Sequence, residues 1–318
     1  MNKTEPQVLH STRCFWKYGK ESGTTSSYRR FRFGGAATLL MAGILLRLLV
    51  FTVLKPLDND TGHLDVIKFM VEHHRLPSAM TNSQSFHPPL YYLLAAPLYA
   101  ATDSVKAVQV LSLVFSVLTL ILFYRLLYVD RLIEGRKPRL YAFLFACFLP
   151  QFVLYGLYVS NDTLAVFLGA LLVVQVVRYI KNSRGQELVF LGLVESLGLL
   201  TKATFLAFLP ALFMLVMFAC LRRGRSVSRA FGAAFLLLVL SCTAGSYKFI
   251  RNYMDVGDPF FSNLDMRSNS WVAQQELSYH GSAIPCSFMV RFGISTSPNQ
   301  VLLGAVTHLS TIWDRSSM

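Results

Sequence analysis

The feature that most constrains this chain is a series of long apolar runs that are almost free of charge. Gly34–Leu54 is interrupted only by Arg47, and Ala107–Tyr124 carries no charge at all. The hydrocarbon core of a bilayer is about 30 Å thick, so roughly 20 helical residues at about 1.5 Å each can cross it. Runs of this length predict an all-α, polytopic helical membrane protein.

Seven transmembrane helices are expected, together with interfacial helices in the first outer loop. Leu140–Ser160 is predicted to kink at Pro150, because a proline inside a helix removes a backbone hydrogen bond. Leu188–Leu221 is too long for one span and suits two short spans that turn near Lys202. The predicted spans are Gly34–Leu54, Ala107–Tyr124, Leu140–Ser160, Thr163–Val177, the two halves of Leu188–Leu221, and Ala230–Tyr247.

Composition excludes the other broad classes. Hydrophobic residues make up 53% of the 318 residues and charged residues only 15%, whereas soluble domains carry about 25% charged residues. A soluble globular protein, a coiled coil and a disordered chain are therefore excluded. The five cysteines show no spacing typical of a metal site or a disulfide framework.

The net charge of +13 is interpreted as a topology signal. Four segments hold 19 of the 30 basic residues, and with seven spans all four fall on one side of the membrane. Because lysine and arginine are enriched in cytoplasmic loops, this side is predicted to be the cytoplasm. Nucleic-acid binding is not expected. The four segments are the first 33 residues, Arg125–Arg139, Arg178–Glu187 and Arg222–Arg229.

This topology divides the chain into a basic cytoplasmic tail at 1–33, a transmembrane domain at 34–250 and an outer-side segment at 251–318. A transit peptide is the alternative for the tail. Pro88–Ala101 is short for a span, and counting it as one would break the charge pattern. It is predicted to lie at the outer interface as a helix, with Tyr91, Tyr92 and Tyr99 in the headgroup zone.

The first outer loop contains two carboxylates, Asp58 and Asp60, two positions apart and close to His63. Such a pair can bind a divalent cation, or one carboxylate can act as a general base while the other orients it. The alternative is that Asp60 caps a helix running from Gly62 to Arg75. Both hypotheses stay open at this point.

A histidine stands at the start of the predicted interfacial helix. His87 precedes Pro88 and Pro89, and a proline pair favours the first turn of a helix. His87 would thus lie at the positive end of that helix, where an anion can bind. A purely structural histidine is the alternative.

Three more charged residues are predicted on the outer side. Asp162 would cap the fourth span, and Lys202 would lie at an outer turn, where it could bind a lipid phosphate or pair with Glu195. Arg251 follows the last span and could equally be a solvated arginine. Arg47 is expected to extend outward from the first span. One polar layer over an apolar bundle suits a substrate with an apolar anchor and an anionic head, a lipid phosphate.

Five elements in this order resemble the GT-C superfamily of membrane glycosyltransferases, in the branch of the protein O-mannosyltransferases and the bacterial aminoarabinose transferases. The resemblance covers about Gly34 to Pro259, and the His-Pro-Pro-Leu-Tyr-Tyr run is its most specific part. The elements are Asp58-Asn59-Asp60, His87 to Tyr92, Ser160-Asn161-Asp162, Leu200-Thr201-Lys202, and Arg251 to Pro259.

The resemblance implies a glycosyltransferase that moves a sugar from a polyprenyl-phosphate donor to a glycan, lipid or protein acceptor on the outer face, with inversion at the anomeric carbon. Asp58 or Asp60 would be the catalytic base, and His87, Lys202 and Arg251 would bind the donor phosphate. Asp58, Asp60 and His87 would hold Mg²⁺ or Mn²⁺ in members that use a metal. His63, Tyr91, Asn161 and Asp162 would complete the site.

Two other classes of function remain open. A transporter or lipid flippase would carry ionisable groups near the bilayer midplane, as Glu195 and Arg47 could be. The chain ends where a further span of the family would be expected, so a truncated, non-catalytic membrane protein is the third hypothesis. The bacterial inner membrane is favoured over the endoplasmic reticulum as its location.

Overall fold

The computed structural model describes residues 27–56 and 62–262, with side chains from residue 35 onward. Every regular element in these ranges is a helix, which confirms the predicted all-α fold. The elements are α1 (Ser27–Val53), α2 (His63–His73), α3 (Leu90–Thr102), α4 (Val105–Tyr124), the π-helix η1 (Arg125–Val129), α5 (Arg136–Phe148), α6 (Pro150–Tyr155), α7 (Asn161–Asn182), α8 (Gly185–Leu199), the 3₁₀-helix η2 (Ala203–Ala207), α9 (Phe208–Arg222), α10 (Val227–Gly245) and α11 (Tyr247–Val256).

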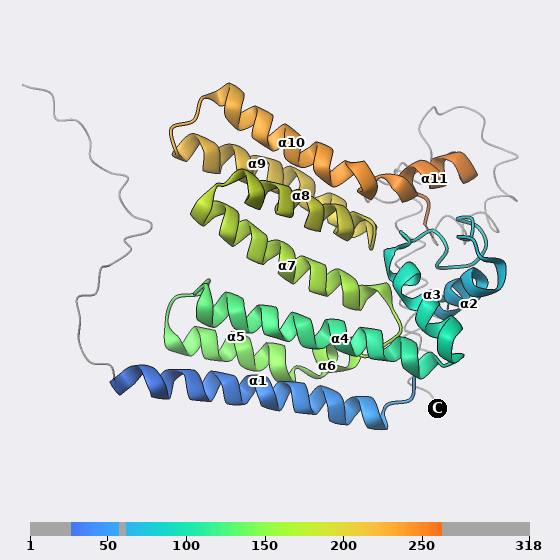
Figure 1. Ribbon diagram of the computed structural model, residues 1–318, viewed down its shortest axis with the longest axis horizontal. Coiled ribbons are helices and arrows are strands. Elements are labelled where there is room, and N and C mark those ends of the chain that lie inside the picture. Colours follow the sequence, from blue (N-terminus) through green and yellow to red (C-terminus); the bar gives the residue numbers. More distant parts are fainter. Residues whose placement is uncertain (1–26, 57–61, 263–318) are drawn as a thin grey trace, which may run out of the picture.

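The long helices run side by side as one bundle, and α2, α3 and α11 gather at one end of it (Figure 1). Five stretches are long and apolar enough to cross a membrane, which confirms a polytopic membrane protein. Helices α5, α6 and α8 lie along the same bundle but are shorter, so the count of seven spans stays a prediction. The five stretches are Gly35–Val53, Val105–Val129, Asn161–Asn182, Ala203–Arg222 and Val227–Gly245.

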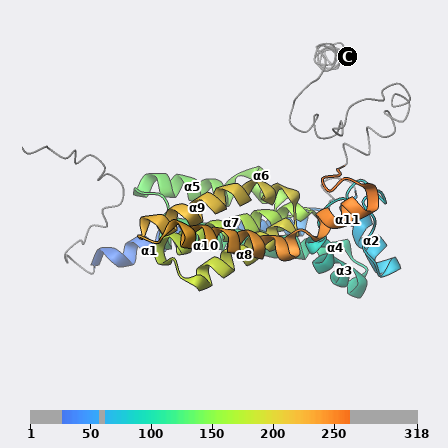
Figure 2. The same ribbon diagram turned by 90° about the horizontal axis from the view of Figure 1, so that it is seen from above.

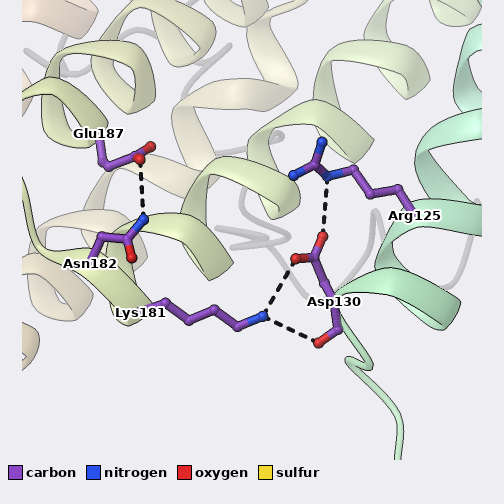
Figure 3. A network of polar contacts seen from close by, with 5 residues as sticks. All are labelled: Arg125, Asp130, Lys181, Asn182 and Glu187. Atoms are coloured by element: carbon purple, nitrogen blue, oxygen red, sulfur yellow. Dashed lines mark hydrogen bonds and ion pairs between the residues drawn. The ribbon is translucent and has the colours of Figure 1, made fainter.

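The basic loops lie together at the end of the bundle opposite α2, α3 and α11 (Figure 1). They connect η1 to α5, α7 to α8, and α9 to α10. Figure 3 shows two of them joined through Asp130, whose carboxylate accepts hydrogen bonds from Arg125 Nε at 3.2 Å and Lys181 Nζ at 3.4 Å. Nearby, Asn182 donates to Glu187 at 3.3 Å across the turn between α7 and α8. Ion pairs thus fix the loops at this end.

Helix α8 packs between α7 and α10. Gly192 and Gly245 allow α8 and α10 to approach closely. A Cβ atom at Gly192 would come within 2.7 Å of Leu240, and one at Gly245 within 2.8 Å of Leu199. Small residues at such crossings favour helix association in membranes, where contacts rather than water expulsion drive packing.

The structure confirms the break at Pro150 but corrects the prediction for Arg47. Arg47 is fully buried and does not extend outward. Its guanidinium donates to the carbonyl oxygens of Ala146 at 2.9 Å and Cys147 at 3.0 Å, and to Ser116 Oγ at 3.0 Å. Pro150 has no N–H, so the carbonyl of Ala146 lacks its normal helical donor. Arg47 supplies that donor and joins α1 to α4 and α5.

The prediction that Tyr91 and Tyr92 lie in the headgroup zone is also wrong. Both side chains are buried, and the Tyr91 hydroxyl lies 3.4 Å from Ser112 Oγ of α4. Tyr99 is only partly buried. Because α3 packs against α2 and α4, its first turn faces protein rather than lipid headgroups.

Candidate functional site

The site lies at the end of the bundle formed by α2, α3, α11, the start of α7 and the turn at residues 200–202. Figures 1 and 2 both show α2, α3 and α11 together at this end. The chain segments that meet here are far apart in sequence. Asp58 and Asp60, the predicted catalytic carboxylates, lie outside the described residues.

Two hydrogen bonds join the starts of α3 and α7 to the turn after α8. Leu90 N, at the first residue of α3, donates to the Leu200 carbonyl oxygen at 2.9 Å. Asn161 Nδ2, at the first residue of α7, donates to the Thr201 carbonyl oxygen at 3.2 Å. Helix ends leave unpaired backbone groups, and here these ends satisfy one another. The turn therefore holds both helices in place.

Lys202 forms an ion pair with Asp162, across the gap between the turn and α7. The expected alternative pairing of Lys202 with Glu195 is wrong, because Glu195 is buried and its oxygens have no partner among the described residues. Asp162 does not cap α7 as predicted. Ser160 is the cap, and its Oγ accepts a hydrogen bond from Asp162 N at 3.2 Å. The Asp162 carboxylate is thereby left available for Lys202.

His87 stacks against His63, with 5.8 Å between the ring centroids and 18° between the planes. His63 is buried, and its Nδ1 lies 2.8 Å from the Tyr92 hydroxyl. Helix α2 begins at His63 with Gly62 at its N-cap position. Asp60, the other suggested cap, lies outside the described residues, so its capping role stays a prediction. The two histidines therefore join α2 to the start of α3.

His87 is held in its neutral form. Burial is the main cause that lowers the pKa of His87 from 6.5 to about 3. The neighbouring His63 and the charges of Lys202 and Lys248 lower this pKa further. Neutral imidazole carries one donor and one acceptor nitrogen. At physiological pH, His87 can thus hydrogen-bond a ligand but adds no positive charge.

Helix α11 supplies two cations to the site. Arg251 Nε donates to Asp255 Oδ1 at 3.1 Å, and this bond is the main cause that raises the pKa of Arg251. Lys248 is buried, and burial lowers its pKa from 10.5 to about 8. Asn252 Nδ2 donates to the Phe86 carbonyl oxygen at 3.4 Å and so fixes α11 next to His87.

A small open pocket, with a cavity volume of only about 10 Å³, lies between these elements. Its polar wall consists of Ser85, His87, Lys248 and Arg251, and its apolar wall comes from α2, the segment after it and α3. The pocket is lined by Val66, Leu76, Pro77, Ser85, His87, Pro89, Tyr92, Tyr247, Lys248 and Arg251. His87 and Arg251 are thus brought together as predicted, whereas Lys202 pairs with Asp162 beside them.

Tyr92 and Lys248 are among the pocket residues that were not predicted from the sequence as site residues. Tyr92 lines the pocket, whereas Tyr91, the predicted site residue, packs into the bundle. Lys248 also lines it, and the available signal was its position three residues before Arg251, on the same face of a helix.

The described residues do not form a metal site by themselves. They contain no group of three His, Cys, Asp or Glu side chains suited to a metal ion. The charged neighbours of His87 are the cations Lys202 and Lys248, which disfavour a further positive charge. A site for Mg²⁺ or Mn²⁺ would therefore need ligands from outside the described residues, where the predicted ligands Asp58 and Asp60 lie.

The fold and the pocket define an integral membrane protein with a cationic site at one end of its bundle. Residues 86–247 match the family model described as dolichyl-phosphate-mannose-protein mannosyltransferase. This match covers half of the chain, and the chain belongs to that family of GT-C type membrane glycosyltransferases. None of the curated proteins compared with the chain matches it.

Proposed function

We propose that the chain transfers a sugar from a polyprenyl-phosphate donor to an acceptor hydroxyl on the outer face of the membrane, with inversion at the anomeric carbon. The observation that carries this proposal is the pocket in which His87, Lys248 and Arg251 meet beside an apolar bundle. A lipid-phosphate sugar has the matching chemistry: an anionic group attached to an apolar chain. The family match, whose description contains a dolichyl-phosphate donor, supports the same donor class.

The proposed reaction is a single displacement. The acceptor oxygen attacks the anomeric carbon and forms the new glycosidic bond, while the bond from that carbon to the phosphate oxygen breaks. The electron pair stays on the phosphate, and Asp58 or Asp60 takes the acceptor proton. Preformed positive charge stabilises the charge that develops on the leaving phosphate. We assign this task to the cations of α11 and the Lys202 turn, with His87 donating or accepting one hydrogen bond.

The experiment measures sugar release by membranes containing the chain from labelled polyprenyl-phosphate sugars. The panel combines mannose and aminoarabinose with dolichyl and undecaprenyl chains, so the preferred donor also separates an endoplasmic from a bacterial location. Transfer by the wild type and its loss in the Asp58→Asn/Asp60→Asn double variant are expected. Asp65→Asn, which removes an exposed carboxylate from α2, is the matched control. Equal transfer by the double variant would refute the assignment of the base.

The same membranes test the predicted metal. If Mg²⁺ or Mn²⁺ takes part, EDTA stops transfer and either ion restores it. If EDTA does not affect transfer, the metal is removed from the proposal, while the assignment of Asp58 or Asp60 as the base is unaffected.

One observation favours a second candidate, a transporter or flippase. The Glu195 carboxyl is buried in the bundle, and neither oxygen has a partner among the described residues. Ionisable groups inside a membrane protein frequently mark a transport pathway. Glu195 therefore provides the residue on which the two candidate functions make opposite predictions.

A further inference from the structure

The three cations next to the pocket do not contribute equally to its positive charge, because two of them are already paired with a carboxylate. Lys202 is paired with Asp162, and Arg251 with Asp255. Each pair is close to neutral, so neither cation is fully available to an anion. Lys248 makes no hydrogen bond and no ion pair within 4 Å in the part of the chain that the structure describes.

Lys248 is also the most buried of the three. Its exposed fraction is 5%, whereas the Lys202 and Arg251 side chains are 27% and 42% exposed. A buried charge without a partner is costly, because the protein replaces only part of its hydration. An anionic ligand in the pocket would remove the cost of the unpaired charge on Lys248. To bind Arg251, the same ligand would have to compete with Asp255.

The position of Lys248 on α11 is well defined. A single residue separates α11 from the end of α10. The Asn252–Phe86 hydrogen bond fixes the next turn of α11 against the loop that carries His87. Residues three and four apart lie on one face of a helix, so Lys248, Arg251 and Asn252 all face that loop. The groups that act on Lys248 are His87 across the pocket and Arg251 and Asp255 on its own helix.

From these observations we propose that Lys248 is the principal cation that binds the donor phosphate, in preference to Arg251 and Lys202. This inference rests on the proposed glycosyltransferase function. Arg251 and Lys202 then contribute less to binding of the phosphate, because each shares its charge with a carboxylate partner. The proposed ligand is a phosphate group attached to an apolar chain. After the sugar has been transferred, the corresponding polyprenyl phosphate remains in the site.

The experiment measures binding of polyprenyl phosphate to the full chain in nanodiscs. Lys248→Gln is expected to weaken binding at least tenfold, because it removes the unpaired charge but keeps a polar side chain only one atom shorter. Lys55→Gln, which neutralises an exposed lysine after α1, is the matched control and is expected to bind within twofold of the wild type. Equal binding by a folded Lys248→Gln protein would overturn the proposal.

A second measurement needs no variant and so remains decisive if Lys248→Gln does not fold. Wild-type protein is treated with an amine-reactive reagent, and labelling of Lys248 and Lys55 is compared by mass spectrometry. Polyprenyl phosphate is expected to protect Lys248 and not Lys55. Unchanged labelling of Lys248 would overturn the proposal, and equal protection by inorganic phosphate at the same concentration would overturn its lipid part.

The two proposals fail in different ways. A wild type that binds polyprenyl phosphate and transfers sugar, with Lys248→Gln unchanged in both, refutes only the assignment to Lys248. A wild type that neither binds this lipid nor transfers sugar refutes both proposals. Binding that depends on Lys248 without any transfer refutes the enzymatic function and keeps the phosphate site.

Discussion

The backbone N–H of Leu90 donates a hydrogen bond to the carbonyl oxygen of Leu200, with 2.9 Å between the two atoms. This bond joins the first residue of α3 to the residue that follows α8. His87 lies three residues before Leu90, and Lys202 two residues after Leu200. The two predicted phosphate-binding residues are therefore positioned by one contact between helix ends, which a change in either segment would disturb.

Lys202→Ala is expected to lower sugar transfer by about 10²–10³-fold without preventing membrane insertion, the loss typical when a group that stabilises developing charge is removed. The variant also leaves Asp162 without its partner. The neutral double variant Asp162→Asn/Lys202→Met separates these effects in a transfer assay. Recovery of transfer in the double variant would mean that Lys202 only neutralises Asp162, whereas continued loss supports a direct role.

The stability of the protein is expected to fall between about pH 6.5 and pH 3 in a way that depends on His87. Burial lowers the pKa of His87 to about 3, while an unfolded chain takes up this proton near pH 6.5. Between these values the unfolded state binds more protons, so stability is full above pH 6.5 and decreases as pH falls. Thermal unfolding in detergent at pH 7 and pH 5 measures this decrease. His87→Gln should reduce the difference, and an unchanged difference would contradict the assignment.

Arg47→Met is expected to destabilise the bundle, since it removes the donors for the carbonyls of Ala146 and Cys147. Leaving a buried acceptor unsatisfied costs about 1–3 kcal/mol, so a clear drop in the thermal midpoint in detergent is predicted. Leu49→Met on the exposed face of α1 is the control. Equal midpoints for Arg47→Met and the control would show that these hydrogen bonds contribute no net stability.

Glu195→Gln distinguishes the two candidate functions. The change keeps the shape of the side chain and removes an ionisable group that has no partner among the described residues. If the chain is a glycosyltransferase, sugar transfer should remain within about twofold of the wild type, because Glu195 lies away from the pocket residues. A transporter that moves protons or ions through the bundle would instead lose its activity.

The sequence predicted the helices well because long apolar runs leave few alternatives in a membrane. Ala107–Tyr124 differs from α4 by two residues at one end, and the turn near Lys202 and the break at Pro150 were both correct. The helix caps were less predictable. Ser160, Asn161 and Asp162 are all good capping residues, and only the local backbone conformation selects Ser160.

Partners distant in sequence could not be predicted. Arg47 can extend along its helix or turn inward, and the choice depends on free carbonyls that are 99 and 100 residues away. In the sequence, Lys248 cannot be distinguished from any other basic residue that follows a membrane span. Only the structure places it in the pocket. Asp58 and Asp60 remain predictions, since they lie outside the described residues.

The hydrogen bond between Asn252 and the Phe86 carbonyl connects residues that are 166 positions apart. It therefore determines when during synthesis the pocket can form. The ribosome must complete α10 and α11 before Lys248 can meet His87, so a nascent chain that already holds α1 to α9 in the membrane has no complete phosphate site. If the proposed function holds, donor binding begins only after α10 and α11 have been inserted.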